Sequence, residues 1–306
     1  MRAAVVDVGS NSTRLLMFEG MGPGGAEGER ITTVTGLRRA AAADGTVSGE
    51  ALARLGQCLD DYAARIAAAG SPPVFAVGTS AVRDAPNRGA IEALVRQRLG
   101  APLRVVDGGV EAALAFAGAR LVLADPRSPC RVLDIGGGST EVVQGDSAGP
   151  RNSVSLALGV NRQGDLITAD PPPAEQVQYI RGVARTMVAE AAGAFPASGP
   201  LIGVAGTVTT AAAILNGRYD PAEVHGMQIT RAQVESVLVG LMPLDDAARR
   251  AVPGLHPDRA NVIVAGLAIL CGALDALGAE SVLVSERDIL DGIAMESARS
   301  GAMPAA

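Results

Sequence analysis

The sequence contains no lysine and no tryptophan, so all 26 of its basic residues are arginine. Without lysine, a Walker-type phosphate loop and a Schiff-base or pyridoxal enzyme are both excluded. The two histidines, His225 and His256, cannot build a histidine-rich metal site, and a Ser-His-Asp triad would need one of them in a loop-like context. The chemistry that remains belongs to carboxylates, hydroxyls, arginines and backbone amides.

Aromatic residues and cysteines are also scarce. Aromatic side chains make up 2% of the chain and the formal net charge is −6, and both values argue against binding to nucleic acid. The three cysteines, Cys58, Cys130 and Cys271, lie far apart without metal-ligand spacing, so we expect buried free thiols.

Long apolar runs are missing as well. No run reaches the roughly 20 residues that cross a bilayer, and the N-terminus reads as a strand rather than a signal peptide. We therefore expect a cytoplasmic protein with neither a membrane nor a nucleic acid as its partner.

The length of the chain indicates two domains. A single core stops growing near 306 residues, and 48% of this sequence is hydrophobic. Strand-like and helix-like segments alternate, which predicts an α/β fold. Turn residues at 125–129 place the boundary, giving an N-terminal domain over 1–124, which the C-terminal helix can complete, and a second domain over 125–306. Helices are predicted over 48–69, 87–99, 110–123, 174–194 and 289–300, with the glycine-rich stretch 20–28 as a link.

One short pattern occurs twice, as Asp7-Val-Gly-Ser-Asn-Ser-Thr-Arg14 and as Asp134-Ile-Gly-Gly-Gly-Ser-Thr-Glu141. In each copy an apolar strand, a carboxylate, a tight Gly/Ser turn and a second apolar strand expose a row of backbone N–H groups beside an acid. A plain hairpin with small residues at its tip explains either copy alone. The repetition favours two phosphate-cradling turns, whose acids can hold a metal ion through water.

These segments, together with a third glycine-threonine turn after a buried strand, resemble the exopolyphosphatase/guanosine pentaphosphatase (Ppx/GppA) family within the actin, Hsp70 and sugar-kinase superfamily. The matching segments follow one another in order across nearly the whole chain: 7–15, 78–87, 110–112, 134–141, 155–162 and 205–207. The resemblance implies a two-domain actin-like (ribonuclease H-like) α/β fold with an active-site cleft between the domains. It is closest to the short two-domain form, since little sequence follows the predicted helix at 289–300.

The resemblance also implies the chemistry. Members release the terminal phosphate of inorganic polyphosphate with Mg²⁺ or Mn²⁺, so we expect a phosphoric anhydride hydrolase, here with a preference for short chains. Guanosine pentaphosphate, a nucleotide of the stringent response, is the alternative substrate. A kinase of the same superfamily, or a nucleotide-dependent regulator or filament subunit, remains a rival. Family likeness further suggests a homodimer.

The family pattern assigns roles to individual residues. Glu111 matches the catalytic base, although many members carry two adjacent glutamates and Val110 stands in place of the first. Without the resemblance, Glu111 would be an ordinary glutamate at the start of a helix. Asp134, Glu141 and Asp7 match positions associated with the divalent metal, and for Asp7 the alternative is an acid that stabilises its own turn.

The remaining matches are predicted to bind phosphate. Arg83 is expected to use its planar fork on phosphate oxygens, with an ordinary surface arginine as the alternative. Arg14, Arg38, Arg39 and Arg162 are weaker candidates that line the approach of the polyanion. The full set predicted to bind phosphate is Asn11, Ser12, Arg83, Gly136, Gly137, Gly138, Ser139, Gly206 and Thr207.

Overall fold

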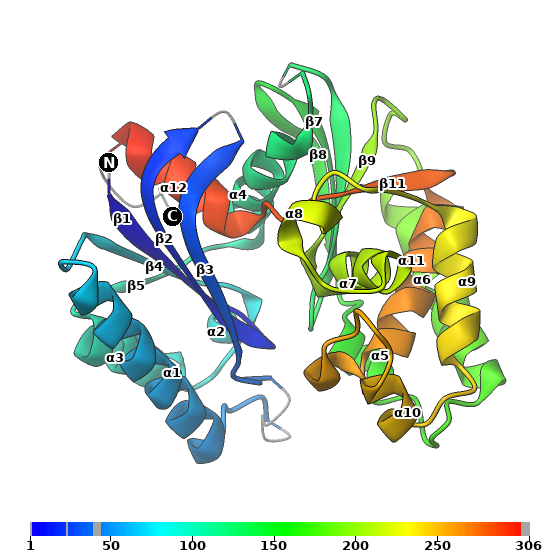
Figure 1. Cartoon of the computed structure of the whole chain (residues 1–306), viewed down its shortest axis with the longest axis horizontal. Coiled ribbons are helices and arrows are strands. Elements are labelled where there is room, and N and C mark those ends of the chain that lie inside the picture. The colour runs from blue at the N-terminus through cyan, green and yellow to red at the C-terminus, as the bar shows by residue number, and fades with distance from the viewer. Residues whose placement is uncertain (1, 23, 39–43, 126, 301–306) are drawn as a thin grey trace. The chain divides into compact units, whose positions relative to one another are not determined.

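The structure is a computed structural model that describes residues 2–22, 24–38, 44–125 and 127–300. Its contacts divide the chain into two compact units, Met1–Gly118 with Ile289–Ala306 and Ala119–Asp288. We call them unit 1 and unit 2 and describe each by itself (Figure 1).

Unit 1 contains a five-stranded sheet in the order β3-β2-β1-β4-β5. Its strands are β1 (Ala3–Val8), β2 (Ser12–Gly22), β3 (Gly25–Val34), β4 (Val74–Gly78) and β5 (Leu103–Val105). The first three form an antiparallel meander, whereas β1, β4 and β5 run parallel to one another. The carboxyl ends of these parallel strands therefore share one edge of the sheet, where ligands usually bind in α/β folds.

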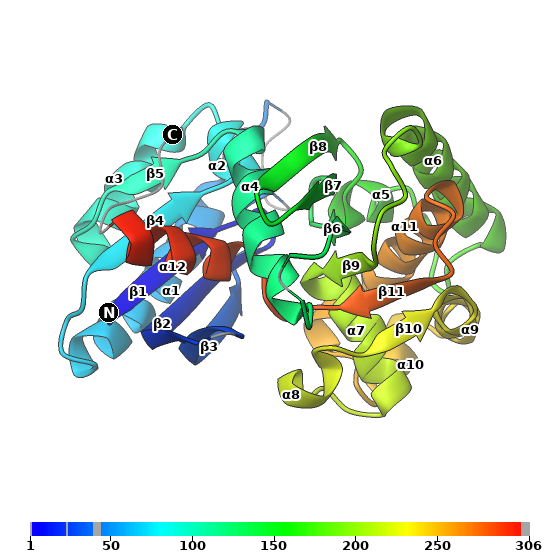
Figure 2. The ribbon, with the colours of Figure 1, turned by 90° about the horizontal axis from the view of Figure 1, so that it is seen from above.

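Helices cover both faces of this sheet. They are α1 (Gly49–Ala68), α2 (Ser80–Arg83), α3 (Arg88–Leu99), α4 (Gly108–Ala119) and α12 (Ile289–Ser300). Alternate residues of β1 point to opposite faces: Val6 packs with α1 and α3, whereas Val5 packs with α4 and α12. Figure 2 shows α12, in red, lying across β1, β2 and β3.

Unit 2 contains a six-stranded sheet in the order β10-β11-β9-β6-β7-β8. The strands are β6 (Cys130–Ile135), β7 (Thr140–Asp146), β8 (Gly149–Leu156), β9 (Leu201–Val204), β10 (Gln228–Thr230) and β11 (Ser281–Val284). As in unit 1, an antiparallel meander (β6, β7, β8) is extended by parallel strands (β9 and β11). The repeat seen in the sequence is thus a repeat of the sheet topology.

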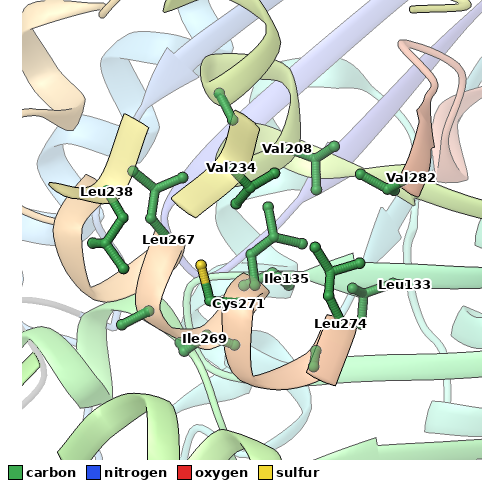
Figure 3. Close-up of a cluster of buried hydrophobic side chains, with 14 of the residues drawn as sticks. Leu133, Ile135, Val208, Val234, Leu238, Leu267, Ile269, Cys271, Leu274 and Val282 are labelled. Atoms are coloured by element: carbon green, nitrogen blue, oxygen red, sulfur yellow. The ribbon is translucent and has the colours of Figure 1, made fainter. Parts of the chain in front are cut away.

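The helices of unit 2 form one large core with its sheet. They are the 3₁₀ turn η1 (Arg120–Val122), α5 (Val160–Gly164), α6 (Ala174–Ala192), α7 (Ala205–Asn216), α8 (Pro221–Val224), α9 (Arg231–Leu241), α10 (Asp246–Arg250), the 3₁₀ turn η2 (Pro257–Arg259) and α11 (Ile263–Ala276). In α11 every residue from Ile263 to Leu274 is buried, as expected of a helix that is apolar on all sides. Figure 3 shows Leu267, Cys271 and Leu274 of α11 gathered near Leu133 and Ile135 of β6.

The predicted α/β class is confirmed, and the helices predicted over 87–99, 174–194 and 289–300 agree with the structure to within about two residues. All three cysteines are free and buried. Across the described residues, no helix combines the length and the apolar character that a membrane span requires.

The prediction that the glycine-rich stretch 20–28 is a link is wrong, because β2 and β3 continue through most of it. The pairing of these strands shifts register between Phe18 and Gly20. A Cβ added at Gly28 would lie 1.8 Å from the carbonyl oxygen of Met17, so this close approach of the strands requires glycine. The glycines that this bulged hairpin requires therefore give it the composition of a linker.

The end of the first unit also differs from the prediction. The helix predicted over 110–123 begins at Gly108 and changes at Arg120 into η1. The contact division falls at Gly118, a few residues before the boundary predicted after residue 124, and it groups α12 with the N-terminal part of the chain in unit 1. Whether the units fold independently as domains stays a prediction.

A buried ion pair fastens α12 to the sheet of unit 1. Arg30 of β3 donates from Nη2 to Oδ1 of Asp291 at 2.6 Å, and the Asp291 side chain is 0% exposed. The backbone N–H of Ala26 donates to the same oxygen at 3.4 Å. The carboxylate thus compensates its desolvation with a charged partner and a backbone donor.

We predict that Asp291→Asn lowers the free energy of unfolding by about 3 kcal/mol, because it removes one partner of a buried pair. The matched control is Glu29→Gln, whose partner Arg65 and own side chain are both about half exposed, and which should cost about 1 kcal/mol or less. Urea unfolding followed by circular dichroism measures both changes. Equal losses for the two variants would contradict the assignment of Asp291 as the fastening residue.

Candidate functional site

The first predicted phosphate turn is the tight connection between β1 and β2. The Gly9 N–H donates to the carbonyl oxygen of Ser12 at 3.0 Å and closes the hairpin. At its tip, the amides of Ser10 and Asn11 donate to no acceptor in the described part of the chain. Ser10 is buried, and a buried amide without an acceptor is costly unless a ligand or water accepts its hydrogen.

The second turn, between β6 and β7, has the same construction. The Gly136 N–H donates to the carbonyl oxygen of Ser139 at 2.9 Å. The amides of Gly137 and Gly138 at the tip likewise find no acceptor among residues 127–300 or the other described ranges. The two copies of the sequence pattern therefore produce two hairpins that each present a pair of adjacent N–H groups.

A segment later in the chain passes behind each turn and holds it. In unit 1, the amides of Thr35 and Gly36 donate to the carbonyl oxygen of Asn11 at 3.1 and 2.9 Å. In unit 2, the amides of Val160 and Asn161 donate to the carbonyl oxygens of Gly136 and Gly137, both at 3.0 Å. Because carbonyl groups of the tips accept these hydrogen bonds, the tips are held in place while their N–H groups stay available to a ligand.

The threonine at the same place in both patterns secures this arrangement. Thr13 and Thr140 are both 0% exposed. The hydroxyl of Thr13 lies 3.0 Å from that of Thr35, and the hydroxyl of Thr140 donates to the carbonyl oxygen of Leu158. Each buried hydroxyl thus connects its hairpin to the segment that supports it.

The two turns differ in charge. Asp7 and Arg14 lie directly opposite each other in the β1–β2 ladder, and Arg14 donates to Oδ2 of Asp7 from Nε at 3.0 Å and from Nη2 at 2.6 Å. This carboxylate, 4% exposed, is therefore neutralised inside unit 1. Arg14, predicted to line the approach of the polyanion, is thus the ion-pair partner of Asp7, and its role toward the polyanion stays a prediction.

At the second turn the opposite position carries an acid. Asp134 and Glu141 face each other in the β6–β7 ladder, so their side chains lie on the same face of the sheet. Ser155 donates to Oε1 of Glu141 at 2.6 Å. Two carboxylates at opposed positions disfavour each other's charge, and a divalent cation relieves this repulsion. These residues therefore fit a hard metal ion better than Asp7 does.

The described residues contain no group of three or more His, Cys, Asp or Glu side chains arranged to hold a metal ion. A Mg²⁺ ion does not require such a group, because it keeps several waters and binds through one or two carboxylates plus the phosphates of its substrate. The Asp134–Glu141 pair meets that smaller requirement.

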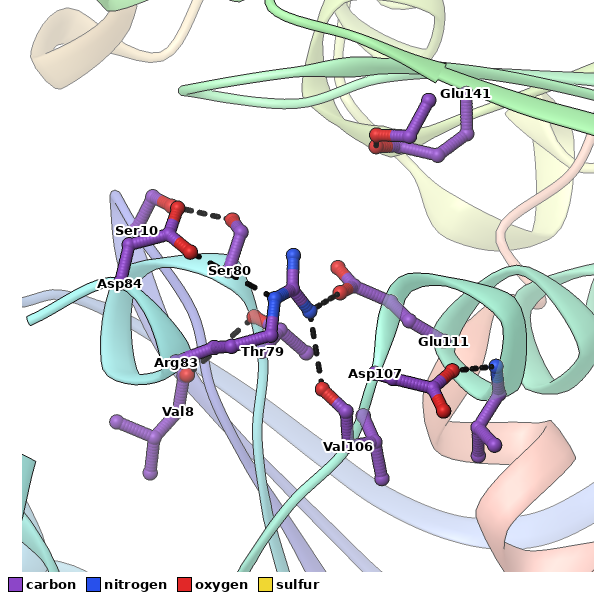
Figure 4. Close-up of polar contacts among 12 residues, drawn as sticks. Val8, Ser10, Thr79, Ser80, Arg83, Asp84, Val106, Asp107, Glu111 and Glu141 are labelled. Carbon is purple, nitrogen blue, oxygen red and sulfur yellow. Dashed lines mark hydrogen bonds and ion pairs between the residues drawn. The ribbon is translucent and has the colours of Figure 1, made fainter. Parts of the chain in front are cut away.

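Arg83 and Glu111 are brought together at the carboxyl edge of the sheet in unit 1 (Figure 4). Arg83, at the end of α2, donates from Nη1 to Oε2 of Glu111 and to the carbonyl oxygen of Val106, both at 3.0 Å. Asp107 accepts a hydrogen bond from the amide of Val110 at 2.8 Å and so caps the start of α4. Val110, which stands where the family pattern leads us to expect a second glutamate, therefore contributes its amide to the cap.

The third predicted turn is the start of α7. Its N-terminus has no side-chain cap, so its first amides are available to an anion. Ala205 adopts a left-handed φ of 63°, which is a strained conformation for a residue with a Cβ. Thr207 is buried. The guanidinium of Arg259 packs against Gly206 so closely that a Cβ at this position would lie 1.6 Å from Nη1.

The predicted residues thus form two groups, one at the carboxyl edge of each sheet. Asp7, Asn11, Ser12, Arg83 and Glu111 belong to unit 1. Asp134, Gly136, Gly137, Gly138, Ser139, Glu141, Gly206 and Thr207 belong to unit 2.

The weaker arginine candidates have separate positions. Arg38 lies 3.5 Å from Asp84 and Arg162 is exposed on α5, whereas Arg39 lies outside the described residues.

Two residues at the edge of unit 2 were missed as site candidates. Arg259 packs on Gly206 and donates to the hydroxyl of Thr210 at 3.3 Å. Glu286 follows the carboxyl end of the parallel strand β11 and accepts a hydrogen bond from Tyr219 at 3.1 Å. Partial desolvation, together with the neighbouring Glu286 carboxylate, raises the pKa of Tyr219. The signal that could have found Glu286 is its place two residues after the apolar run 282–284, which has the composition of a buried strand.

Both sheets, the duplicated hairpins and the acid pair define an α/β protein of actin-like fold that presents backbone amides beside acids at the edges of its sheets. The chain belongs to the Ppx/GppA phosphatase family, whose model matches residues 28–300. It is 35% identical to Exopolyphosphatase 2 of Mycobacterium tuberculosis over 317 aligned residues, which cover 97% of this chain and 98% of that relative. Exopolyphosphatase 1 of the same species is 30% identical, with 99% and 90% covered.

Solved structures agree with this assignment. A crystal structure of an exopolyphosphatase-like protein is 30% identical, superposes with a TM-score of 0.89 and covers 98% of this chain and 99% of that chain. The Ppx/GppA family member of Aquifex aeolicus is 25% identical, with a TM-score of 0.84 and 99% of both chains covered. The predicted family and fold are therefore confirmed.

We predict that Gly159→Ala disturbs the second turn. A Cβ there would lie 2.3 Å from the carbonyl carbon of Gly138 and 2.5 Å from the carbonyl oxygen of Gly137, and because both are backbone atoms, the turn itself must move. The free energy of unfolding should fall by about 1–3 kcal/mol, and calorimetry should show weaker binding of tripolyphosphate. Gly164→Ala, on the same short helix and with nothing within 4 Å of its added Cβ, should leave both unchanged. Unaltered phosphate binding in a folded Gly159→Ala protein would contradict the proposed role of this turn.

Proposed function

We propose that the protein is an exopolyphosphatase that hydrolyses the terminal phosphate of inorganic polyphosphate. The observation that carries this proposal is the pair of hairpins whose tip amides have no acceptor in the described chain, one beside a neutralised acid and one beside an acid pair. The names of the curated relatives support polyphosphate as the substrate.

The protein as a whole is acidic, with a net charge of −6, so its overall charge does not attract a polyanion, and backbone amides can supply the hydrogen-bond donors that the phosphates need. A polyanion must therefore meet local donors rather than a basic surface. We assign phosphate binding in unit 1 to the turn at Asn11 and Ser12 and to Arg83. In unit 2 we assign it to the turn at Gly136, Gly137, Gly138 and Ser139 and to the start of α7 at Gly206 and Thr207.

We assign the role of general base to Glu111. Its carboxylate takes a proton from a water molecule as the water oxygen forms a bond to the terminal phosphorus. The bond from that phosphorus to the bridging oxygen breaks, and the shortened chain leaves with the electron pair. The products are orthophosphate and a polyphosphate shorter by one unit, with the proton held on Oε of Glu111 until it returns to solvent.

We further propose that Asp134 and Glu141 hold Mg²⁺ or Mn²⁺, largely through water. When bound, the ion supplies charge neutralisation for the phosphate oxygens. Asp7 contributes less to this site, because Arg14 already occupies one of its oxygens. Ser155 keeps Glu141 oriented through its hydrogen bond to Oε1.

Guanosine pentaphosphate is the competing substrate, because its 5′ end presents the same terminal anhydride. A kinase would instead transfer phosphate from ATP to an acceptor, for which Glu111 as a water-activating base is not needed. The preference for short polyphosphate and the homodimer are parts of the proposal that rest on the family resemblance, and the cytoplasmic location is an expectation from the sequence.

We predict that Glu111→Gln lowers kcat for polyphosphate by about 100- to 10,000-fold, the usual contribution of a general base, with little change in KM. Orthophosphate release is measured from polyphosphates of defined length, from guanosine pentaphosphate and from ATP. Glu92→Gln, a partly exposed glutamate on α3, is the matched control and should retain full activity. If Glu111→Gln releases phosphate as fast as the wild type, Glu111 is not the general base. If the wild type releases phosphate from none of these substrates, the protein is not the proposed hydrolase.

We predict that Asp134→Asn raises the Mg²⁺ concentration needed for half-maximal activity roughly tenfold or more. Asp7→Asn should instead lower thermal stability, because it breaks the buried pair with Arg14, while the Mg²⁺ requirement changes less. Activity titrated with Mg²⁺ after treatment with a chelator gives the first quantity, and calorimetry gives the second. The reverse pattern would place the ion at the first turn.

A further inference from the structure

Arg83 uses only part of its hydrogen-bonding capacity in the structure. Its Nη1 donates to two acceptors, Oε2 of Glu111 and the carbonyl oxygen of Val106, each at 3.0 Å (Figure 4). These bonds account for both hydrogens of that nitrogen. The Nη2 and Nε hydrogens remain, and Nε is only loosely paired with Asp84 at 3.7 Å.

The remaining donors are placed where a ligand can reach the guanidinium. The Arg83 side chain is 30% exposed, whereas that of Glu111 is 17% exposed. The planar fork presents its nitrogens at fixed angles, so one edge can bind a carboxylate while another binds a phosphate. Binding of phosphate by Arg83 therefore does not require it to leave Glu111.

Leaving Glu111 would also be unfavourable. The pair is mostly buried, and separating it gives up a charge-assisted hydrogen bond in a poorly solvated place. The carbonyl oxygen of Val106, a residue that is 0% exposed, would lose the same donor. The structure therefore favours a guanidinium that keeps its existing partners when the substrate arrives.

The helix that carries Arg83 is linked to the first phosphate turn. The hydroxyls of Ser10, at the tip of that turn, and Ser80, at the start of α2, lie 3.2 Å apart. The hydroxyl of Thr79 lies 3.5 Å from the carbonyl oxygen of Val8, and the amide of Arg83 donates to the carbonyl oxygen of Thr79 at 3.0 Å. The position of Arg83 is thus tied to the turn that would receive the phosphates.

We propose that Arg83 is a positioning residue that bridges Glu111 and the terminal phosphate, holding the base with Nη1 and the phosphate with Nη2 or Nε. This inference rests on the proposed function and goes further, since it makes Arg83 set the geometry of the base rather than bind substrate alone. Lysine preserves the positive charge, but its single ammonium group cannot span both partners in a fixed geometry.

The test is a double-mutant cycle on Arg83→Lys and Glu111→Gln, with Arg88→Lys, an exposed arginine on α3, as the matched control. Arg83→Lys should lower kcat for polyphosphate on the order of 100-fold, as misplacement of a catalytic group does, while KM stays within about threefold. In the Glu111→Gln background, the same change should lower kcat less than about threefold, because the base through which Arg83 acts is already absent. Arg88→Lys should match the wild type throughout.

A raised KM with unchanged kcat, or an equal loss of kcat in both backgrounds, would overturn the bridge while leaving the hydrolase intact. A second measurement does not depend on turnover: nitrogen-15 spectra of the arginines with and without imidodiphosphate, a non-hydrolysable mimic. The bridge predicts that the Arg83 Nη1 signals stay in place while the Nη2 or Nε signals shift. Displacement of Nη1, or no change at Arg83 when the mimic binds, contradicts it even if no substrate is hydrolysed.

Discussion

The structure depends above all on where the backbone hydrogen bonds of two hairpin tips go. In both tips the carbonyl oxygens accept hydrogen bonds from a crossing segment, whereas the amides do not donate within the described chain. Each tip is therefore rigid and still able to bind an anion. Glycine permits this at Gly159, where any side chain would collide with the second tip, and the buried threonines Thr13 and Thr140 secure it. A protein without lysine can bind phosphate in this way.

Charge divides the duplicated turns into two types. The residue opposite the aspartate that both copies share is Arg14 in one copy and Glu141 in the other. The first copy is neutral and suits phosphate alone, and the second has two acids and suits phosphate together with a cation. The difference at this one position of the repeat thus gives two similar hairpins different charges.

Much of this could be predicted from the sequence, because the signals are local. The repeated pattern predicted both hairpins, and the alternation of strands and helices predicted the fold class. The stretch 20–28 misled because glycines at a strand bulge have the composition of a linker. Arg259 and Glu286 were missed as site candidates because they reach the edge of their sheet through contacts between distant segments, such as that between Arg259 and Gly206. The Arg83–Glu111 pair joins two residues that were predicted separately, and only the structure shows their contact.

The central claim is that the tip amides bind phosphate, and backbone amide NMR during titration with imidodiphosphate and Mg²⁺ tests it most directly. The account predicts that the largest shifts occur at the amides of Ser10, Asn11, Gly137 and Gly138. Shifts confined to exposed arginines such as Arg88 and Arg162, with these four amides unchanged, would contradict it.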